Sequence, residues 1–136
     1  MNISVRQVQG RVPVAVLGVQ GDLDASNYQD LIAKATEVYG SGTRDMLLDL
    51  THTSFVSSSG LVAIHSVAML ARGEPPPEQD AGWGAVQAIR RGLGTGVQEH
   101  VKLLSPQPKV VSTLEKTGMM EFFEIHTDLD AAVASF

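Results

Sequence analysis

The chain has 136 residues, 43% of them hydrophobic, and ten Lys and Arg against fifteen Asp and Glu, which gives a formal charge of -5. This length and composition predict one globular domain of 1–136 and exclude two ordinary domains. The absence of cysteine excludes disulfides and thiol chemistry, and an acidic chain without a basic cluster is not expected to bind nucleic acid directly.

The N-terminal segment carries no signature of export. Polar residues interrupt positions 1–10, where a signal peptide would need an apolar core. No stretch of roughly 20 apolar residues follows, so no membrane insertion is expected. We therefore expect a cytoplasmic protein.

The first part of the chain predicts a β-hairpin. β-branched residues recur on both sides of Gly10 and Arg11, as expected for two paired strands. Pro13 lies in the second run and indicates a strand start or an edge position. Gly21 is expected to end that strand.

A helix is predicted next from the spacing of apolar residues. Between Tyr28 and Tyr39 such residues recur every three or four positions, which is typical of one helix face. Gly40 is expected to stop this helix. Asp24 precedes it and is either an N-cap or a partner-binding residue.

The most informative part of the chain is a strand, a serine-rich loop and a helix in direct succession. Met46–Leu50 predicts a short strand covered on both faces. A polar loop leads to three serines at positions 57–59, and Gly60–Ala71 is apolar enough all round to predict a buried helix. The serines are thereby placed at a helix N-terminus, where unpaired N–H groups and the helix dipole favour a phosphate. One of them is expected to cap the helix.

Residues 72–98 differ from the rest of the chain. Three consecutive prolines and several glycines predict a long, mobile insertion.

The C-terminal part resumes the alternation of strands and helices. A strand is predicted over His100–Leu104, followed by a helix that starts near Pro108 and ends at Gly118. Phe122–Ile125 indicates a last short strand, and Thr127-Asp128 is expected to cap a final helix. The predicted order is β-β-α-β-α-β-α-β-α, which indicates an α/β fold with helices packed against a mixed β-sheet.

Three motifs, in this order, resemble those of a known family. Gly21-Asp22-Leu23-Asp24-Ala25 is similar to its G-E-L-D-A segment. Leu48-Asp49-Leu50, then Phe55, then Ser58-Ser59-Gly60-Leu61 resemble its LDL strand and D-S-S-G-L helix start. Leu114-Glu115-Lys116-Thr117-Gly118-Met119 is similar to its L-x-x-T/S-G-L helix end. The chain thus resembles the STAS-domain family, and within it the stand-alone bacterial anti-sigma factor antagonists.

The resemblance implies a regulatory protein without catalysis, cofactor or metal. Such antagonists bind an anti-sigma factor, usually also a serine kinase, and so free a sigma factor for transcription. Phosphorylation of one serine breaks the complex, and a serine phosphatase resets it. Alignment on Gly60 puts the phosphoacceptor at Ser58, with Ser57 and Ser59 as alternates. The partner-binding residues expected from this arrangement are Asp22, Asp24, Ser57, Ser59 and Gly60.

Ser57 stands where the family often has an aspartate, which makes it a competing acceptor. Two other functions remain open. One is a non-phosphorylated STAS interaction module of a transporter or other regulatory assembly, and the other is an enzyme or small-ligand binder with residues 72–98 as a lid. The four histidines lack metal-ligand spacing, and Val56–Gly60 is not a G-x-S-x-G elbow. Neither metal chemistry nor hydrolysis is therefore expected.

Overall fold

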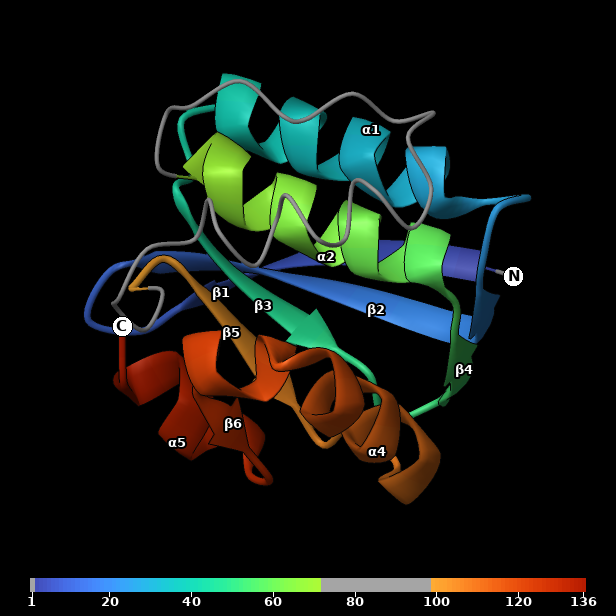
Figure 1. Ribbon diagram of the computed structural model, residues 1–136. Coiled ribbons are helices and arrows are strands. Elements are labelled where there is room, and N and C mark those ends of the chain that lie inside the picture. The colour runs from blue at the N-terminus through green and yellow to red at the C-terminus, as the bar shows by residue number, and fades with distance from the viewer. Residues whose placement is uncertain (1, 72–98) are drawn as a thin grey trace.

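A computed structural model describes residues 2–71 and 99–136 (Figure 1). The insertion predicted at 72–98 lies outside the described residues. The elements in chain order are β1 (Asn2–Gln9), β2 (Pro13–Leu23), α1 (Tyr28–Gly40), β3 (Asp45–Asp49), β4 (Thr53–Val56), α2 (Ser58–Ala71), β5 (Val101–Leu104), α4 (Pro108–Thr117), the 3-10 helix η1 (Met119–Phe122), β6 (Ile125–His126) and α5 (Leu129–Ala134).

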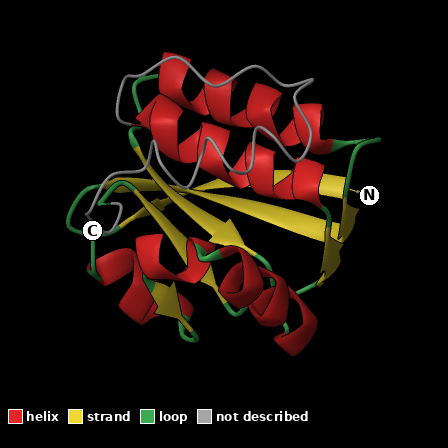
Figure 2. Cartoon of the chain, viewed as in Figure 1, coloured by secondary structure: helices red, strands yellow, loops and turns green. Residues whose placement is uncertain are grey.

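The strands form one mixed sheet in the order β1-β2-β3-β5-β6, and β4 pairs with β2. β1 and β2 are antiparallel, whereas every other pair is parallel. Figure 2 shows α1 and α2 side by side on one side of the sheet and α5 on the other. The larger hydrophobic cluster joins the sheet to α1, α2 and α4, and a smaller one lies under α5. The predicted α/β architecture with packed helices is confirmed.

Several predicted boundaries are confirmed by their local geometry. β2 begins at Pro13, which pairs with Gln9 of β1. α4 ends at Gly118, whose left-handed φ of 76° is readily adopted only by a residue without Cβ. Asp128 caps α5, because its carboxylate accepts the N–H of Ala131 at 3.0 Å.

β4 was not predicted, and the expected end of β2 was wrong. Thr53 is buried although polar, because its hydroxyl donates to the Val19 carbonyl at 2.8 Å. Gly21 adopts a φ of 94°, and the strand register shifts there. The chain therefore bends at Gly21 rather than stopping, and β2 continues to Leu23 in partnership with β4.

The last predicted strand is shorter than expected. Met119–Phe122 forms a 3-10 turn, and only Ile125–His126 pair with β5. Phe123 is buried in the larger cluster, so this apolar run fills the core instead of extending the sheet. No helix among the described residues is long and apolar enough to cross a membrane.

Candidate functional site

The three serines lie where β4 passes directly into α2. The N–H of Ser57 donates to the Leu23 carbonyl at 2.9 Å, which ties the end of β4 to the end of β2. α2 begins at Ser58, two residues before the predicted start at Gly60. All three serines are half-buried, so they lie at the boundary between the core and the surface.

Ser57 caps α2, which confirms the expectation that one of the serines does so. Its hydroxyl accepts the N–H of Gly60 at 3.2 Å, and its carbonyl accepts the N–H of Leu61 at 3.0 Å. Ser58 and Ser59 occupy the first two helical positions, where N–H groups have no partner within a helix. The hydrogen bonds of the described residues include none from the Ser58 hydroxyl. A phosphate on Ser58 would meet free donors and the positive end of the α2 dipole.

Gly60 lets α2 approach the sheet closely. A methyl group at this position would lie 2.5 Å from the carbonyl oxygen of Leu23 and 2.8 Å from Cγ1 of Val56. Neither distance is compatible with an ordinary van der Waals contact. Gly60 is also buried, so it serves the site by positioning the serines rather than by presenting a group of its own.

Asp22 and Asp24 lie at the same end of the sheet as the serines. Asp22 is exposed on the extension of β2, where it pairs with Phe55 of β4. Asp24 is not the N-cap of α1, because Asn27 occupies that position. Instead, the Asp24 carboxylate accepts the hydroxyl of Ser26 at 2.6 Å and its N–H at 2.9 Å. These two hydrogen bonds lower the pKa of Asp24 below its ordinary value of 3.8, so the group is ionised at neutral pH.

Phe55 and Lys109 extend the surface formed by the serines, Asp22 and Asp24. No local sequence pattern identifies these two residues as neighbours. Phe55 remains 38% exposed, and the Lys109 Nζ lies 5.6 Å from the centroid of its ring. Gln107 donates to the Thr51 carbonyl at 2.9 Å and so holds the start of α4 against the turn before β4. Only the tertiary fold brings these segments together.

The STAS domain model matches residues 5–72, which span β1 to α2 and include all three serines. The chain belongs to the STAS-domain family. No curated protein sequence matches this STAS domain.

Solved structures of other proteins share the fold of this STAS domain. A candidate anti-sigma factor antagonist from Thermotoga maritima aligns with a TM-score of 0.65 at 17% identity, over 96% of this chain and 90% of that chain. An anti-sigma factor antagonist from Mycobacterium paratuberculosis gives 0.61 at 18%, over 98% and 93%. Unphosphorylated SpoIIAA, a Bacillus protein, gives 0.59 at 17%, over 96% and 93%. At these identities the likeness establishes the fold.

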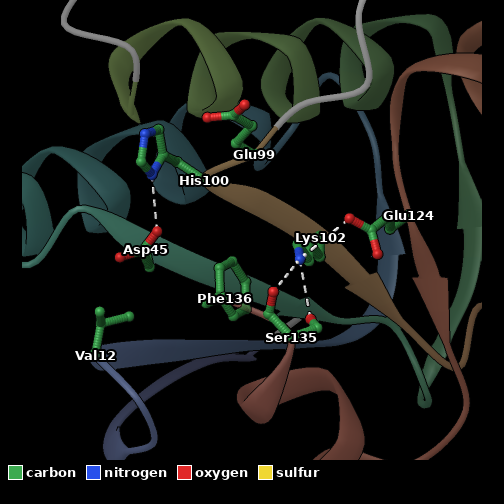
Figure 3. A pocket seen from close by; sticks show the side chains of 8 residues that line it. All are labelled: Val12, Asp45, Glu99, His100, Lys102, Glu124, Ser135 and Phe136. Carbon is green, nitrogen blue, oxygen red and sulfur yellow. Dashed lines mark hydrogen bonds and ion pairs between the residues drawn. The ribbon is translucent and has the colours of Figure 1, made fainter.

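A cavity of about 400 Å³ lies at the end of the sheet away from the serines, near the amino ends of the parallel strands β3 and β5 (Figure 3). Asp45 opens β3 and His100 precedes β5, whereas the serines follow the carboxyl end of β4. The lining residues are Val12, Asp45, Glu99, His100, Lys102, Glu124, Ser135 and Phe136.

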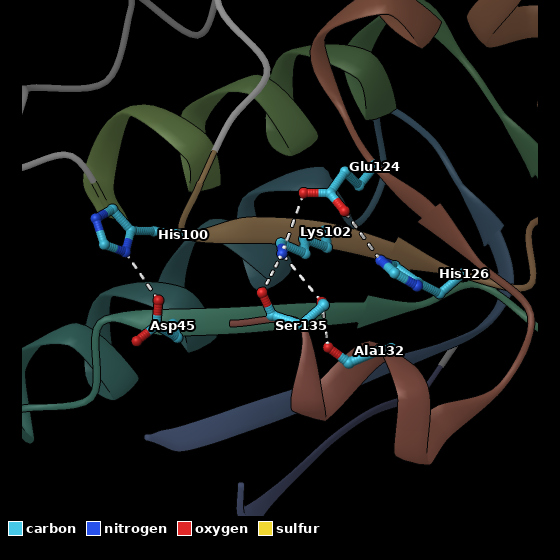
Figure 4. Close-up of polar contacts among 7 residues, drawn as sticks. All are labelled: Asp45, His100, Lys102, Glu124, His126, Ala132 and Ser135. Atoms are coloured by element: carbon cyan, nitrogen blue, oxygen red, sulfur yellow. Dashed lines mark hydrogen bonds and ion pairs between the residues drawn. The ribbon is translucent and has the colours of Figure 1, made fainter. Parts of the chain in front are cut away.

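Lys102 organises this cavity and is only 4% exposed. Its ammonium donates to the carbonyl of Ser135 at 2.9 Å and to its hydroxyl at 3.0 Å, and it pairs with Glu124 at 3.1 Å (Figure 4). The ring centroid of Phe136 lies 4.7 Å from the same nitrogen. An ammonium has three N–H donors, and the three contacts with oxygen atoms use all of them. Lys102 therefore fastens the end of α5 to the sheet and has no donor left for a ligand.

The carboxylates near Lys102 are also paired with histidines. His100 Nδ1 lies 2.8 Å from Asp45, and His126 Nε2 lies 3.3 Å from Glu124. Across residues 2–71 and 99–136, no three His, Asp or Glu side chains gather in a way that could hold a metal ion. The serine end of the sheet is thus the stronger candidate for a functional site.

Proposed function

We propose that this STAS domain is an anti-sigma factor antagonist controlled by phosphorylation of Ser58. The unmodified domain binds an anti-sigma factor that is also a serine kinase, and so frees a sigma factor. The observation that carries this proposal is the position of Ser58 in the first turn of a buried helix, directly after Ser57, which is hydrogen-bonded to Leu23 between Asp22 and Asp24. The fold neighbours named as antagonists support it, and one of them, SpoIIAA, has been solved in a phosphorylated form.

Electrostatics explains how such a switch works without unfolding the domain. A phosphoserine carries about -1.5 to -2 charges at pH 7. The N-terminus of α2 tolerates that charge, because the helix dipole and the free N–H groups of the first turn stabilise it. A partner surface shaped for a neutral hydroxyl must instead desolvate a dianion beside two acidic residues, Asp22 and Asp24. Phosphorylation therefore breaks the complex, and a serine phosphatase restores binding.

The capping role of Ser57 supports Ser58 as the acceptor. Aspartate, which the family often has at this position, is another preferred N-cap residue. Ser57 therefore preserves the structural role of the position, and its hydroxyl is already bound to the N–H of Gly60. Modification of Ser57 would disturb that cap, whereas modification of Ser58 leaves it in place. Ser57 and Ser59 act as neighbours that contact the partner, together with Asp22 and Asp24, while Gly60 acts through the backbone.

The direct test is phosphorylation by the purified serine-kinase anti-sigma factor of the same genome, with ATP and mass spectrometry. We expect one phosphate on Ser58, none in a Ser58→Ala variant, and normal phosphorylation of Ser57→Ala and Ser59→Ala. Phosphate on Ser57 or Ser59 instead would reassign the acceptor. An unmodified chain would overturn the switch and favour an interaction module of a transporter or other assembly.

A further inference from the structure

Phe55 is an exposed aromatic residue held in place by the surrounding fold. In β4 the flanking residues Thr53 and Val56 are buried, and the Thr53 hydroxyl is bound to the Val19 carbonyl. These contacts fix the orientation of the strand and leave Phe55 facing solvent. Val5, Tyr39 and Phe55 are the large hydrophobic residues exposed in the described part of the chain, and Phe55 is the one next to the serines.

Two charged residues of opposite sign, Asp22 and Lys109, neighbour Phe55. Asp22 is its register partner on β2, and neighbouring strands are about 4.8 Å apart. From the start of α4, the ammonium of Lys109 lies 5.6 Å from the ring centroid, within the range of a cation–π contact. The contact between Gln107 and Thr51 fixes the α4 turn that carries Lys109. The three side chains form an acid–aromatic–base row, the Asp22–Phe55–Lys109 row.

We propose that the Asp22–Phe55–Lys109 row is the anchor by which the anti-sigma factor recognises this domain, with Phe55 as the main contact. This inference rests on the proposed function and extends it to residues beyond the serine loop. Preorganised aromatic residues next to charged groups are typical binding hot spots, because little conformational freedom is lost when they are buried. The row calls for a partner surface with an apolar pocket, a basic group facing Asp22 and an acidic group facing Lys109.

The row also explains why a phosphate on Ser58 would strongly weaken binding of the partner. Ser57 follows Val56 directly, and both are tied to Leu23, the neighbour of Asp22 in β2. A partner seated on Phe55 is therefore held over the start of α2. A phosphate introduced at Ser58 then lies inside the contact area rather than at its rim, where water would screen it.

Affinity for the purified anti-sigma factor, measured by calorimetry, tests the inference. We expect Phe55→Ala to weaken binding about 30-fold, as for a hot-spot residue, and Phe55→Leu to recover part of the loss. Lys109→Met keeps the aliphatic stem but removes the charge, and should weaken binding about threefold while flattening its salt dependence. Val5→Ala removes an equally exposed side chain, 41% accessible on β1, and serves as the matched control that leaves affinity unchanged.

The outcomes separate this inference from the proposed function. If the unsubstituted chain does not bind the anti-sigma factor at all, the proposed function fails and this inference fails with it. If it binds and Phe55→Ala behaves like Val5→Ala, the anchor is wrong while the antagonist role stands. Thermal melting of each variant excludes a loss of folding. Concentration-dependent self-association abolished by Phe55→Ala, with anti-sigma affinity unchanged, would assign the row to a second copy of the chain and overturn the proposal.

Discussion

At the scale of single residues, Gly60 and Ser57 determine how α2 begins. Gly60 removes the side chain that would collide with the end of β2, and Ser57 satisfies one N–H of the first turn. The sequence predicts a cap among three serines but does not tell which one, because all three have the same chemistry. It likewise cannot distinguish the turn that Asp24 forms with Ser26 from a helix cap, because both use the same carboxylate.

Gly60→Ala should destabilise the domain by about 1–3 kcal/mol, because the new methyl group has to displace backbone. Urea denaturation measures this change. Gly40→Ala is the matched control, since no atom lies within 4 Å of a methyl group there. It should leave stability unchanged or slightly raise it. Equal effects of the two substitutions would show that close packing at Gly60 is unimportant.

Ser57→Ala should cost about 0.5–2 kcal/mol of stability through loss of the cap, whereas Ser57→Asp should retain it. An aspartate accepts the same N–H and interacts favourably with the helix dipole. Chemical denaturation compares both with Ser59→Ala, which removes no capping bond. A Ser57→Asp variant as unstable as Ser57→Ala would argue against the cap.

At the scale of elements, the strength of the local pattern decides what could be predicted. α2 is apolar nearly all round, and β3 contains three consecutive buried apolar residues, Met46–Leu48, so both could be predicted from local sequence. β4 could not be predicted, because it has only four residues and its first residue, Thr53, is polar. Thr53 is buried only because its hydroxyl is bonded to the Val19 carbonyl, a contact that the local sequence does not indicate. Lys102 is similar, because its burial depends on Glu124 and Ser135, which come from distant parts of the chain.

The Lys102 contacts predict how stability depends on pH. Partial burial raises the pKa of Glu124, but the hydrogen bond and charge of Lys102, and then those of His126, outweigh it and lower the pKa below 4.5. A carboxyl group whose pKa is lowered by folding stabilises the fold above its unfolded value, and this contribution is lost as pH falls through the folded value.

Acidification from pH 6 to below 4.5 should therefore destabilise the unsubstituted chain more than a Lys102→Met variant. Melting temperatures across this range measure the difference. Lys34→Met removes the partner of Glu37 in an exposed pair and is the control, expected to follow the unsubstituted chain. Parallel curves for Lys102→Met and the unsubstituted chain would contradict the assigned role of the pair.

At the scale of the whole molecule, the two ends of the parallel strands differ in what they offer. The amino ends of β3 and β5 border a cavity whose buried ammonium is fully engaged. The carboxyl ends of β2 and β4 carry Asp22, Phe55 and the serines at the start of α2. Asp22 and Phe55 are exposed there and can contact a partner. The sequence motifs locate the serine loop, but the meeting of β4 with α4 is a long-range contact that no local pattern reports.

In the proposed switch, phosphate on Ser58 controls a protein–protein contact without altering the fold. The most direct measurement is the affinity of the purified anti-sigma factor for the unmodified and the Ser58-phosphorylated chain, by calorimetry at one salt concentration. We predict binding at least about 100-fold weaker for the phosphorylated chain, equivalent to about 2.8 kcal/mol, with unchanged far-UV circular dichroism. Equal affinity of the two forms would show that phosphorylation of Ser58 does not control this contact.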